Sequence, residues 1–197
     1  MGTRFRTMWF TIFLFVALIA QALYFAVVGA WSEVFVVTVA IIFSLIPYAL
    51  TRYYKLESSE WVRTGIVFFT FCTLVLGEVY KFYSIFWWWD IFLHAIAGAG
   101  LAVVMYIWLC NLINLKSIVN TPWLYSLFVF CGANTVLVLW EVYEFFIDQL
   151  EWSSNRMQPS LYDTMVDITI GLLSVLLVCL GGFVFLFRQR IKANNMV

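Results

Sequence analysis

Charged side chains are scarce in this sequence of 197 residues: they make up 11%, whereas hydrophobic residues make up 64%. Soluble globular proteins carry about 25% charged residues, so this composition excludes a soluble globular chain and favours a membrane protein. The sequence also lacks a convincing internal repeat and a glycine-rich nucleotide-binding loop. We expect the lipid bilayer to be its main partner and expect no nucleic-acid partner.

Closely spaced cysteine pairs are absent as well. The chain contains four cysteines, and no two of them form a CxxC pattern. Neither a zinc knuckle nor a disulfide framework is therefore indicated. We expect all four to be small residues of a helical core: Cys72, Cys110, Cys131 and Cys179.

Long apolar runs, by contrast, are abundant. A helix needs about 20 residues to cross a bilayer. The runs cover residues 8–28, 34–50, 62–80, 87–113, 124–147 and 161–187. Because the segments between them are short, the sequence predicts an all-α polytopic membrane protein. Residues 1–197 are expected to form a single bundle of six transmembrane helices with no soluble domain.

The distribution of basic residues predicts the orientation of these spans. Lys and Arg are enriched on the cytoplasmic side of membrane proteins. In a six-span arrangement nine of the 11 basic residues fall on one side, and only Lys81 and Arg156 fall on the other. Both termini are therefore expected in the cytoplasm.

The most informative stretch is WWWDIFLHAIAG, from Trp87 to Gly98. Three successive tryptophans are typical of a membrane interface. Directly inside them, Asp90 and the only histidine, His94, lie one helical turn apart and therefore on one face. An acid inside a transmembrane helix costs roughly 2.5–3.5 kcal/mol on insertion scales and is usually functional. Gly98 continues the same stripe and predicts the close approach of another helix.

A second polar stripe lies in the expected helix 124–147, which has a clear start signal at Thr121 and Pro122. Four polar residues share one helical face. Counted from Asn134, the other three follow at offsets of 7, 10 and 14 residues. The middle two are an acid pair directed at the bundle interior, and the last is expected at the interface, where solvation explains it. The four are Asn134, Glu141, Glu144 and Asp148.

The expected last helix opens with a third stripe. Ser160 and Asp163 fit a capping box, and Asp163 also suits the positive end of the helix. Asp167 lies one turn deeper, where capping cannot explain it. Gly171 follows at the next turn, so this helix repeats the acid–polar–glycine spacing of the stretch 87–98.

Two further charged residues lie near these stripes. Glu78, at the extracytoplasmic end of helix 62–80, is three residues from Lys81, and an interfacial ion pair explains it slightly better than a role in a site. Arg156, in the loop before the last helix, is the one basic residue placed to meet a phosphate there.

The topology places the deepest polar residues in the extracytoplasmic half of the membrane, because they begin or end successive helices there. Five carboxylates and one imidazole cannot all be charged in a confined site, so they either share protons or surround a cation. One imidazole among carboxylates suits Zn, Mn or Fe. A functional cavity is favoured over a structural polar network. Its expected metal ligands are Asp90, His94, Glu141, Glu144, Asp163 and Asp167.

The segments that carry these residues also resemble a known family. LGEVYKFYSIFWWWDIFLHAIAG, LWEVYEFFIDQL and MQPSLYDTMVDITIG are similar to the YjdF-like group of uncharacterised bacterial inner-membrane proteins. They resemble VanZ-like proteins more distantly, and Asp167 stands where those proteins commonly carry an Asn. The resemblance covers the last four spans. It implies six spans in the bacterial cytoplasmic (inner) membrane, and the VanZ-like similarity implies a role in the cell envelope.

Three functions remain open. A metal-dependent hydrolase or transferase acting on an envelope lipid or lipid-linked substrate would use the metal to activate water, with Glu141 or Glu144 as general base. A proton- or cation-coupled transporter needs polar groups that continue to the cytoplasmic side, and the sequence offers few beyond Asn134. A non-enzymatic envelope or assembly protein would use the cluster for packing alone. The oligomeric state is not indicated.

The topology makes the first testable prediction. A cysteine introduced at Ser154 should react with a membrane-impermeant thiol reagent in intact cells, because the loop before the last helix is expected outside. A cysteine at Ser58 should react only after permeabilisation. The reverse labelling pattern would refute both the orientation and the outward-facing site.

Overall fold

The computed structural model describes residues 2–54, 59–112, 121–149 and 157–194, and these residues contain helices and no strand. Six helices are long and apolar enough to cross a membrane, which confirms an all-α polytopic membrane protein. The elements are α1 (Gly2–Val28), α2 (Trp31–Tyr54), α3 (Glu60–Thr70), the π-helix η1 (Phe71–Val79), α4 (Phe82–Ile85), α5 (Trp89–Leu112), α7 (Pro122–Gln149) and α8 (Leu161–Asn194).

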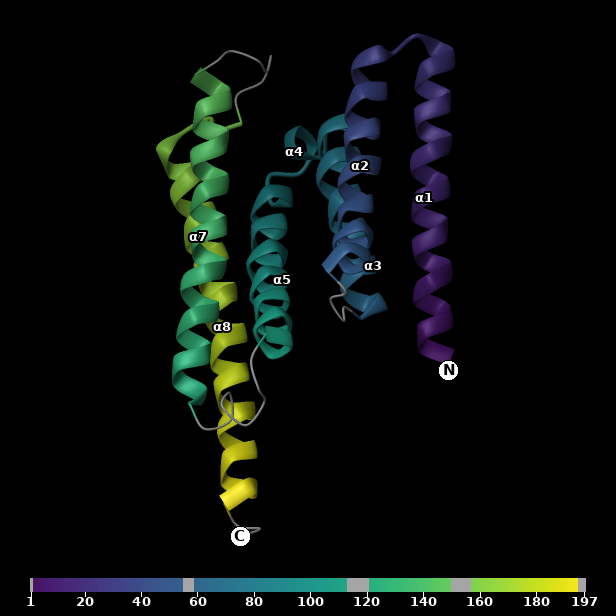
Figure 1. Cartoon of the computed structure of the whole chain (residues 1–197). Helices are drawn as coiled ribbons and strands as arrows, with labels where there is room; N and C mark the ends of the chain where they lie inside the picture. Colours follow the sequence, from purple (N-terminus) through teal and green to yellow (C-terminus); the bar gives the residue numbers. More distant parts are fainter. Residues whose placement is uncertain (1, 55–58, 113–120, 150–156, 195–197) are drawn as a thin grey trace. The chain divides into compact units, whose positions relative to one another are not determined.

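These elements form two compact units, Met1–Trp89 and Asp90–Val197. In the first unit α2 packs against α1, α3 and η1 (Figure 1). Its core consists of small and branched apolar side chains that are fully buried: Leu18, Val37, Ala40 and Val75. In the second unit α5, α7 and α8 surround a separate apolar core. The single six-helix domain expected from the sequence stays a prediction.

The expected helix 62–80 changes its hydrogen bonding halfway along. It is α-helical to Thr70 and continues as the π-helix η1. The Tyr80 N–H donates to the Val75 carbonyl, five residues back, at 3.0 Å. The chain then turns sharply at Lys81, whose φ of 60° lies in the left-handed region. The sequence predicts the span but not this change, because hydrophobic periodicity does not distinguish α from π bonding over so few residues.

The start signals of the last two long helices are confirmed. α7 begins at Pro122, directly after Thr121, whose carbonyl accepts from the Leu124 N–H at 3.1 Å. α8 begins at Leu161, and the Asp163 N–H donates to Ser160 Oγ at 3.2 Å. Ser160 therefore caps α8 as its sequence predicts, and this cap fixes where the Asp163–Asp167 stripe starts.

The cysteines are only partly the core residues that the sequence predicts. Cys72 and Cys179 are buried, whereas Cys110 and Cys131 are exposed on the helix surface, so the expectation was wrong for those two. The physical reason is that lipid tails are as apolar as a protein core. A small apolar side chain therefore gains little from burial in a membrane protein.

In the second unit α7 and α8 make the most extensive contact, and α5 approaches α8 closely at one point, Gly98. A Cβ atom added at Gly98 would lie 2.5 Å from the Gly171 carbonyl oxygen and would also overlap Ser174 Oγ. Below this point, six buried side chains from the three helices form the core: Ala102, Val129, Ala133, Leu137, Val175 and Cys179. The small-residue stripe expected at Gly98 is thus a helix–helix contact, as such stripes are in many membrane proteins.

This contact makes the second prediction. Gly98→Ala should lower the free energy of unfolding by roughly 1–3 kcal/mol, because the added methyl forces α5 and α8 apart. Gly100→Ala is the matched control on the same helix, since a Cβ there would meet nothing within 4 Å. Because alanine has a higher helix propensity than glycine, Gly100→Ala should leave the free energy of unfolding unchanged or raise it by up to about 1 kcal/mol. Equal thermal unfolding of the two variants in detergent would contradict the contact.

Candidate metal centre

Three helices bring acidic side chains and the histidine to one end of the second unit. Asp90 and His94 occupy the first two turns of α5, Glu141 lies two turns before the end of α7, and Asp167 lies in the second turn of α8. His94, Glu141 and Asp167 are buried. The Asp90 side chain keeps 35% of its surface exposed. The helices thus gather these groups from sequence positions up to 77 residues apart.

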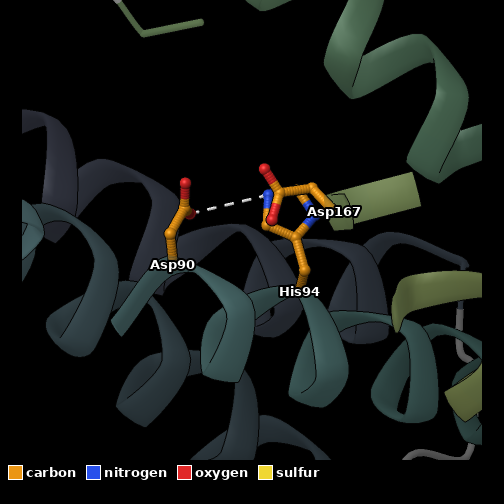
Figure 2. Close-up of side chains that lie close together, drawn as sticks. All are labelled: Asp90, His94 and Asp167. Carbon is orange, nitrogen blue, oxygen red and sulfur yellow. Dashed lines mark ion pairs between the residues drawn. The ribbon is translucent and has the colours of Figure 1, made fainter. Parts of the chain in front are cut away.

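The side chains meet around the imidazole of His94. Its Nε2 atom lies 3.6 Å from Asp90 Oδ1 and 3.7 Å from Glu141 Oε1. Asp90, His94 and Asp167 each offer one ligand atom, and these atoms lie within 4.8 Å of one another. Figure 2 shows Asp90 and His94 on the same face of α5, with the Asp167 carboxylate beside the imidazole. Three of the six expected ligands therefore form a triad that could hold a metal ion.

The two distances from His94 Nε2 suit shared metal ligation better than direct hydrogen bonding. Hydrogen bonds between nitrogen and oxygen are about 2.7–3.2 Å long, and both distances exceed that range. Two ligand atoms about 2.1 Å from a tetrahedral zinc ion lie about 3.4 Å apart. The separations of Asp90 Oδ1 and Glu141 Oε1 from His94 Nε2 are close to this value, so each of these oxygens could share a divalent cation with His94.

Glu141 supplies a second, independent sign of a ligand site. Its side chain is only 5% exposed, and within the described part of the chain its Oε1 atom is buried without a hydrogen-bond donor. Leaving a buried acceptor unsatisfied costs about 1–3 kcal/mol, and more for a charged group. This oxygen faces His94 Nε2. A cation bound beside His94 would satisfy it.

Close helix packing is what holds the triad together. His94 precedes Gly98 by one turn on α5, and Asp167 precedes Gly171 by one turn on α8. Because Gly98 has no side chain, the Gly171 backbone of α8 lies directly against α5. His94 and Asp167, one turn away, therefore come close to each other. The two glycines of the repeated acid–polar–glycine spacing serve different contacts: Gly98 admits the backbone of α8, and Gly171 admits Leu137 of α7.

Glu144 and Asp163 lie beside the triad rather than in it. Glu144 is half-buried, and its Oε1 accepts a hydrogen bond from the exposed Trp140 Nε1 at 2.7 Å. It also interacts electrostatically with Glu141 and Asp90. Asp163 is half-buried and interacts with the charge of Asp167. Both acids are therefore near the centre without facing His94 at ligand distance.

The remaining expected residues have other partners or other places. Asn134 Nδ2 donates to the Phe130 carbonyl of its own helix at 2.8 Å. Asp148 accepts backbone hydrogen bonds from the segment before α8. Glu78 is exposed near the end of η1 in the first unit. Arg156 lies outside the described residues.

Gln158 is a polar residue of the site that the sequence did not indicate. Its Nε2 atom donates to the Glu141 carbonyl at 2.8 Å and to Glu141 Oε2 at 3.0 Å. No spacing or periodicity points to it, because it lies in a short polar loop where glutamine is common. Only the contact with α7 identifies it.

Besides His94, the described part of the second unit places no basic side chain near these carboxylates. The described Lys and Arg residues there all lie in the last turns of α8. At a rise of 1.5 Å per residue, Arg188 is about 30 Å along α8 from Asp167. Buried acids without a counter-ion are expensive inside a membrane, so a cation or shared protons must balance them.

A comparison with known proteins identifies one family. A family model described as "Predicted membrane protein (DUF2238)" matches residues 7–188, which is most of the chain and includes every residue of the centre. No curated protein and no solved structure matches the chain.

Proposed function

The chain belongs to the DUF2238 family of predicted membrane proteins, and we propose that it is a metal-dependent hydrolase or transferase of the bacterial cytoplasmic membrane. Its centre would be formed by Asp90, His94, Glu141 and Asp167. The substrate would be an envelope lipid or a lipid-linked precursor that reaches the centre from the extracytoplasmic side. Zn, Mn or Fe would suit one imidazole nitrogen among carboxylate oxygens.

One observation carries this proposal: the buried Glu141 Oε1 atom, without a hydrogen-bond donor, faces His94 Nε2 at 3.7 Å beside the triad. A cluster of acids alone would have a simpler explanation in solvation or shared protons. A buried oxygen that faces the histidine and has no hydrogen-bond donor is better explained by a bound cation. The triad supplies three donor atoms. Glu141 Oε1, which lies near His94 but outside that group, would supply the fourth that zinc sites use.

The side chains around the centre would have separate roles in the proposed reaction. A divalent metal in such a centre supplies an activated water or a polarised phosphoryl or carbonyl oxygen. Glu144 lies beside the centre, and its Oε2 atom is left to accept a proton while Oε1 is held by Trp140. We assign Glu144 as the general base and Glu141 as a ligand. Asp163, at the first turn of α8, adds negative charge that would strengthen cation binding.

The packing argues against the other two functions. A transporter needs a polar route across the membrane, but the buried core beneath the centre is apolar, from Leu137 and Ala102 to Cys179. A purely structural network should join its polar atoms by hydrogen bonds. The contacts of His94 with Asp90 and Glu141 are longer than such bonds, and Glu141 Oε1 has none.

Removing the imidazole is the third prediction. His94→Ala should weaken zinc binding by more than the roughly 10–100-fold typical of residues that only orient ligands, because it removes the single nitrogen donor. Elemental analysis of the purified full-length protein and a chelator-competition titration would measure this loss. The parent should also melt at higher temperature when zinc is added, since a ligand at 100 times its Kd stabilises the folded state by about 2.7 kcal/mol.

Asn134→Ala is the matched control for that titration. Asn134 shares the polar stripe of α7, but among the described residues its side chain bonds a carbonyl of its own helix, so zinc binding should be unchanged. A parent protein with no stoichiometric metal, and with a melting temperature indifferent to Zn, Mn and Fe, would refute the metal centre. The acids would then be a proton-sharing polar core.

Replacing the proposed base is the fourth prediction. Glu144→Gln should retain metal, since the amide can still accept from Trp140, and should abolish turnover because it cannot take a proton. Vesicles of bacterial lipid extract incubated with each protein would be analysed by mass spectrometry for released phosphate, headgroups or acyl chains. Turnover equal to that of the parent would exclude Glu144 as base. A parent without any product would remove the enzymatic proposal while leaving the metal centre standing.

A further inference from the structure

Gln158 lies just before α8 and is held to α7 through its backbone. Asp148, near the end of α7, accepts from two successive amides: Oδ1 from the Met157 N–H and Oδ2 from the Gln158 N–H, both at 2.8 Å. Both oxygens of one carboxylate are thereby used on one short segment. Charge-assisted hydrogen bonds of this kind are about twice as strong as neutral ones. The position of the Gln158 backbone is therefore fixed relative to α7.

The Gln158 side chain reaches back two turns along α7 to a single residue. Its Nε2 atom donates to the Glu141 carbonyl at 2.8 Å and to Glu141 Oε2 at 3.0 Å. An amide nitrogen carries two hydrogens, so both of its donors are spent on Glu141. This contact restrains the backbone and the carboxylate of Glu141 together.

The contact determines which way the Glu141 carboxylate faces. With Oε2 held by Gln158, rotation of the carboxylate would break a hydrogen bond, so Oε1 remains directed at His94 Nε2. That atom is buried and has no donor in the described structure. One oxygen is thus fixed by an amide while the other is presented to the centre.

We propose that Gln158 is a positioning residue, which orients Glu141 as the fourth ligand of the metal centre, and that Asp148 acts through Gln158 by holding it in place. The inference rests on the proposed metal centre and adds two residues that do not touch the metal. Metal-binding carboxylates are generally oriented by such hydrogen bonds, and removing the partner typically weakens metal binding 10–100-fold.

The test measures zinc affinity in the purified full-length protein. Gln158→Leu keeps a similar size but removes both donors, and the dissociation constant for zinc should rise roughly 10–100-fold. Gln149→Leu is the matched control, because Gln149 is an exposed glutamine at the end of α7. Its zinc affinity should equal that of the parent.

A double-mutant cycle tests whether Asp148 acts through Gln158. Asp148→Ala should also weaken zinc binding, because the Gln158 backbone loses its anchor. The double variant should then bind zinc no more weakly than Gln158→Leu alone, since residues on one path are not additive. If the two substitutions weaken zinc binding independently, so that their effects multiply in the double variant, Asp148 does not act through Gln158. Asp148→Asn, which keeps the shape of the side chain, provides a milder variant should the alanine variant not fold.

A cobalt spectrum separates positioning from simple stabilisation. The visible absorption of protein-bound Co²⁺ responds to the number and geometry of its ligands, so Gln158→Leu should change the band intensity whereas Gln149→Leu should not. A merely structural role predicts instead a lower melting temperature of the metal-free protein with the spectrum and the zinc affinity unchanged. That result would overturn the inference while leaving the metal centre intact. A parent that binds neither Zn²⁺ nor Co²⁺ would overturn both.

Discussion

The contact between α5 and α8 at Gly98 and Gly171 is the constraint on which the proposed centre depends. A side chain at either position would have to displace backbone or a packed neighbour, because α8 lies against Gly98 and Leu137 fills the space beside Gly171. His94 and Asp167 each lie one turn from these glycines, so their distance follows from the distance between the helices. Close packing, rather than any attraction between the polar groups, is what can bring an imidazole and a carboxylate together inside a membrane.

The acids of the second unit differ in which of their oxygens accept a hydrogen bond, and this difference indicates a ligand site beside His94. Asp148 uses both oxygens on backbone amides, Glu144 uses one on Trp140, and Glu141 uses one on Gln158. The buried oxygen without a donor is Glu141 Oε1, which faces His94. In a network built only for packing, unsatisfied atoms would be avoided because each one is costly. The position of this one unsatisfied oxygen beside the histidine is what a ligand site requires.

Local periodicity was enough to predict the six spans, the shared face of Asp90 and His94, and the cap at Ser160, since each depends on residues within a few turns. Local periodicity could not predict contacts between segments that are far apart in the sequence. Asn134 shares a helical face with Glu141, yet its side chain bonds the Phe130 carbonyl and takes no part in the centre. Gln158 stands in the segment MQPSLYDTMVDITIG that resembles the YjdF-like group, but it has no helical spacing to the acids, and only the structure shows its contact with Glu141. The change to π bonding after Thr70 was equally invisible, because it alters backbone hydrogen bonds without altering the apolar pattern.

Glu144 lies between an exposed tryptophan of α7 and the buried centre. Trp140 is 46% exposed and holds the Glu144 carboxylate through its indole nitrogen, while Glu144 interacts electrostatically with the buried Glu141. Under the proposed function, an amphiphile approaching from the bilayer would meet Trp140 first, then Glu144, and only then the metal ligands. Tryptophan suits that first position because its ring favours the boundary between lipid and water. Under the same proposal, a base one turn from Glu141 and outside the triad would receive a proton without entering the coordination sphere.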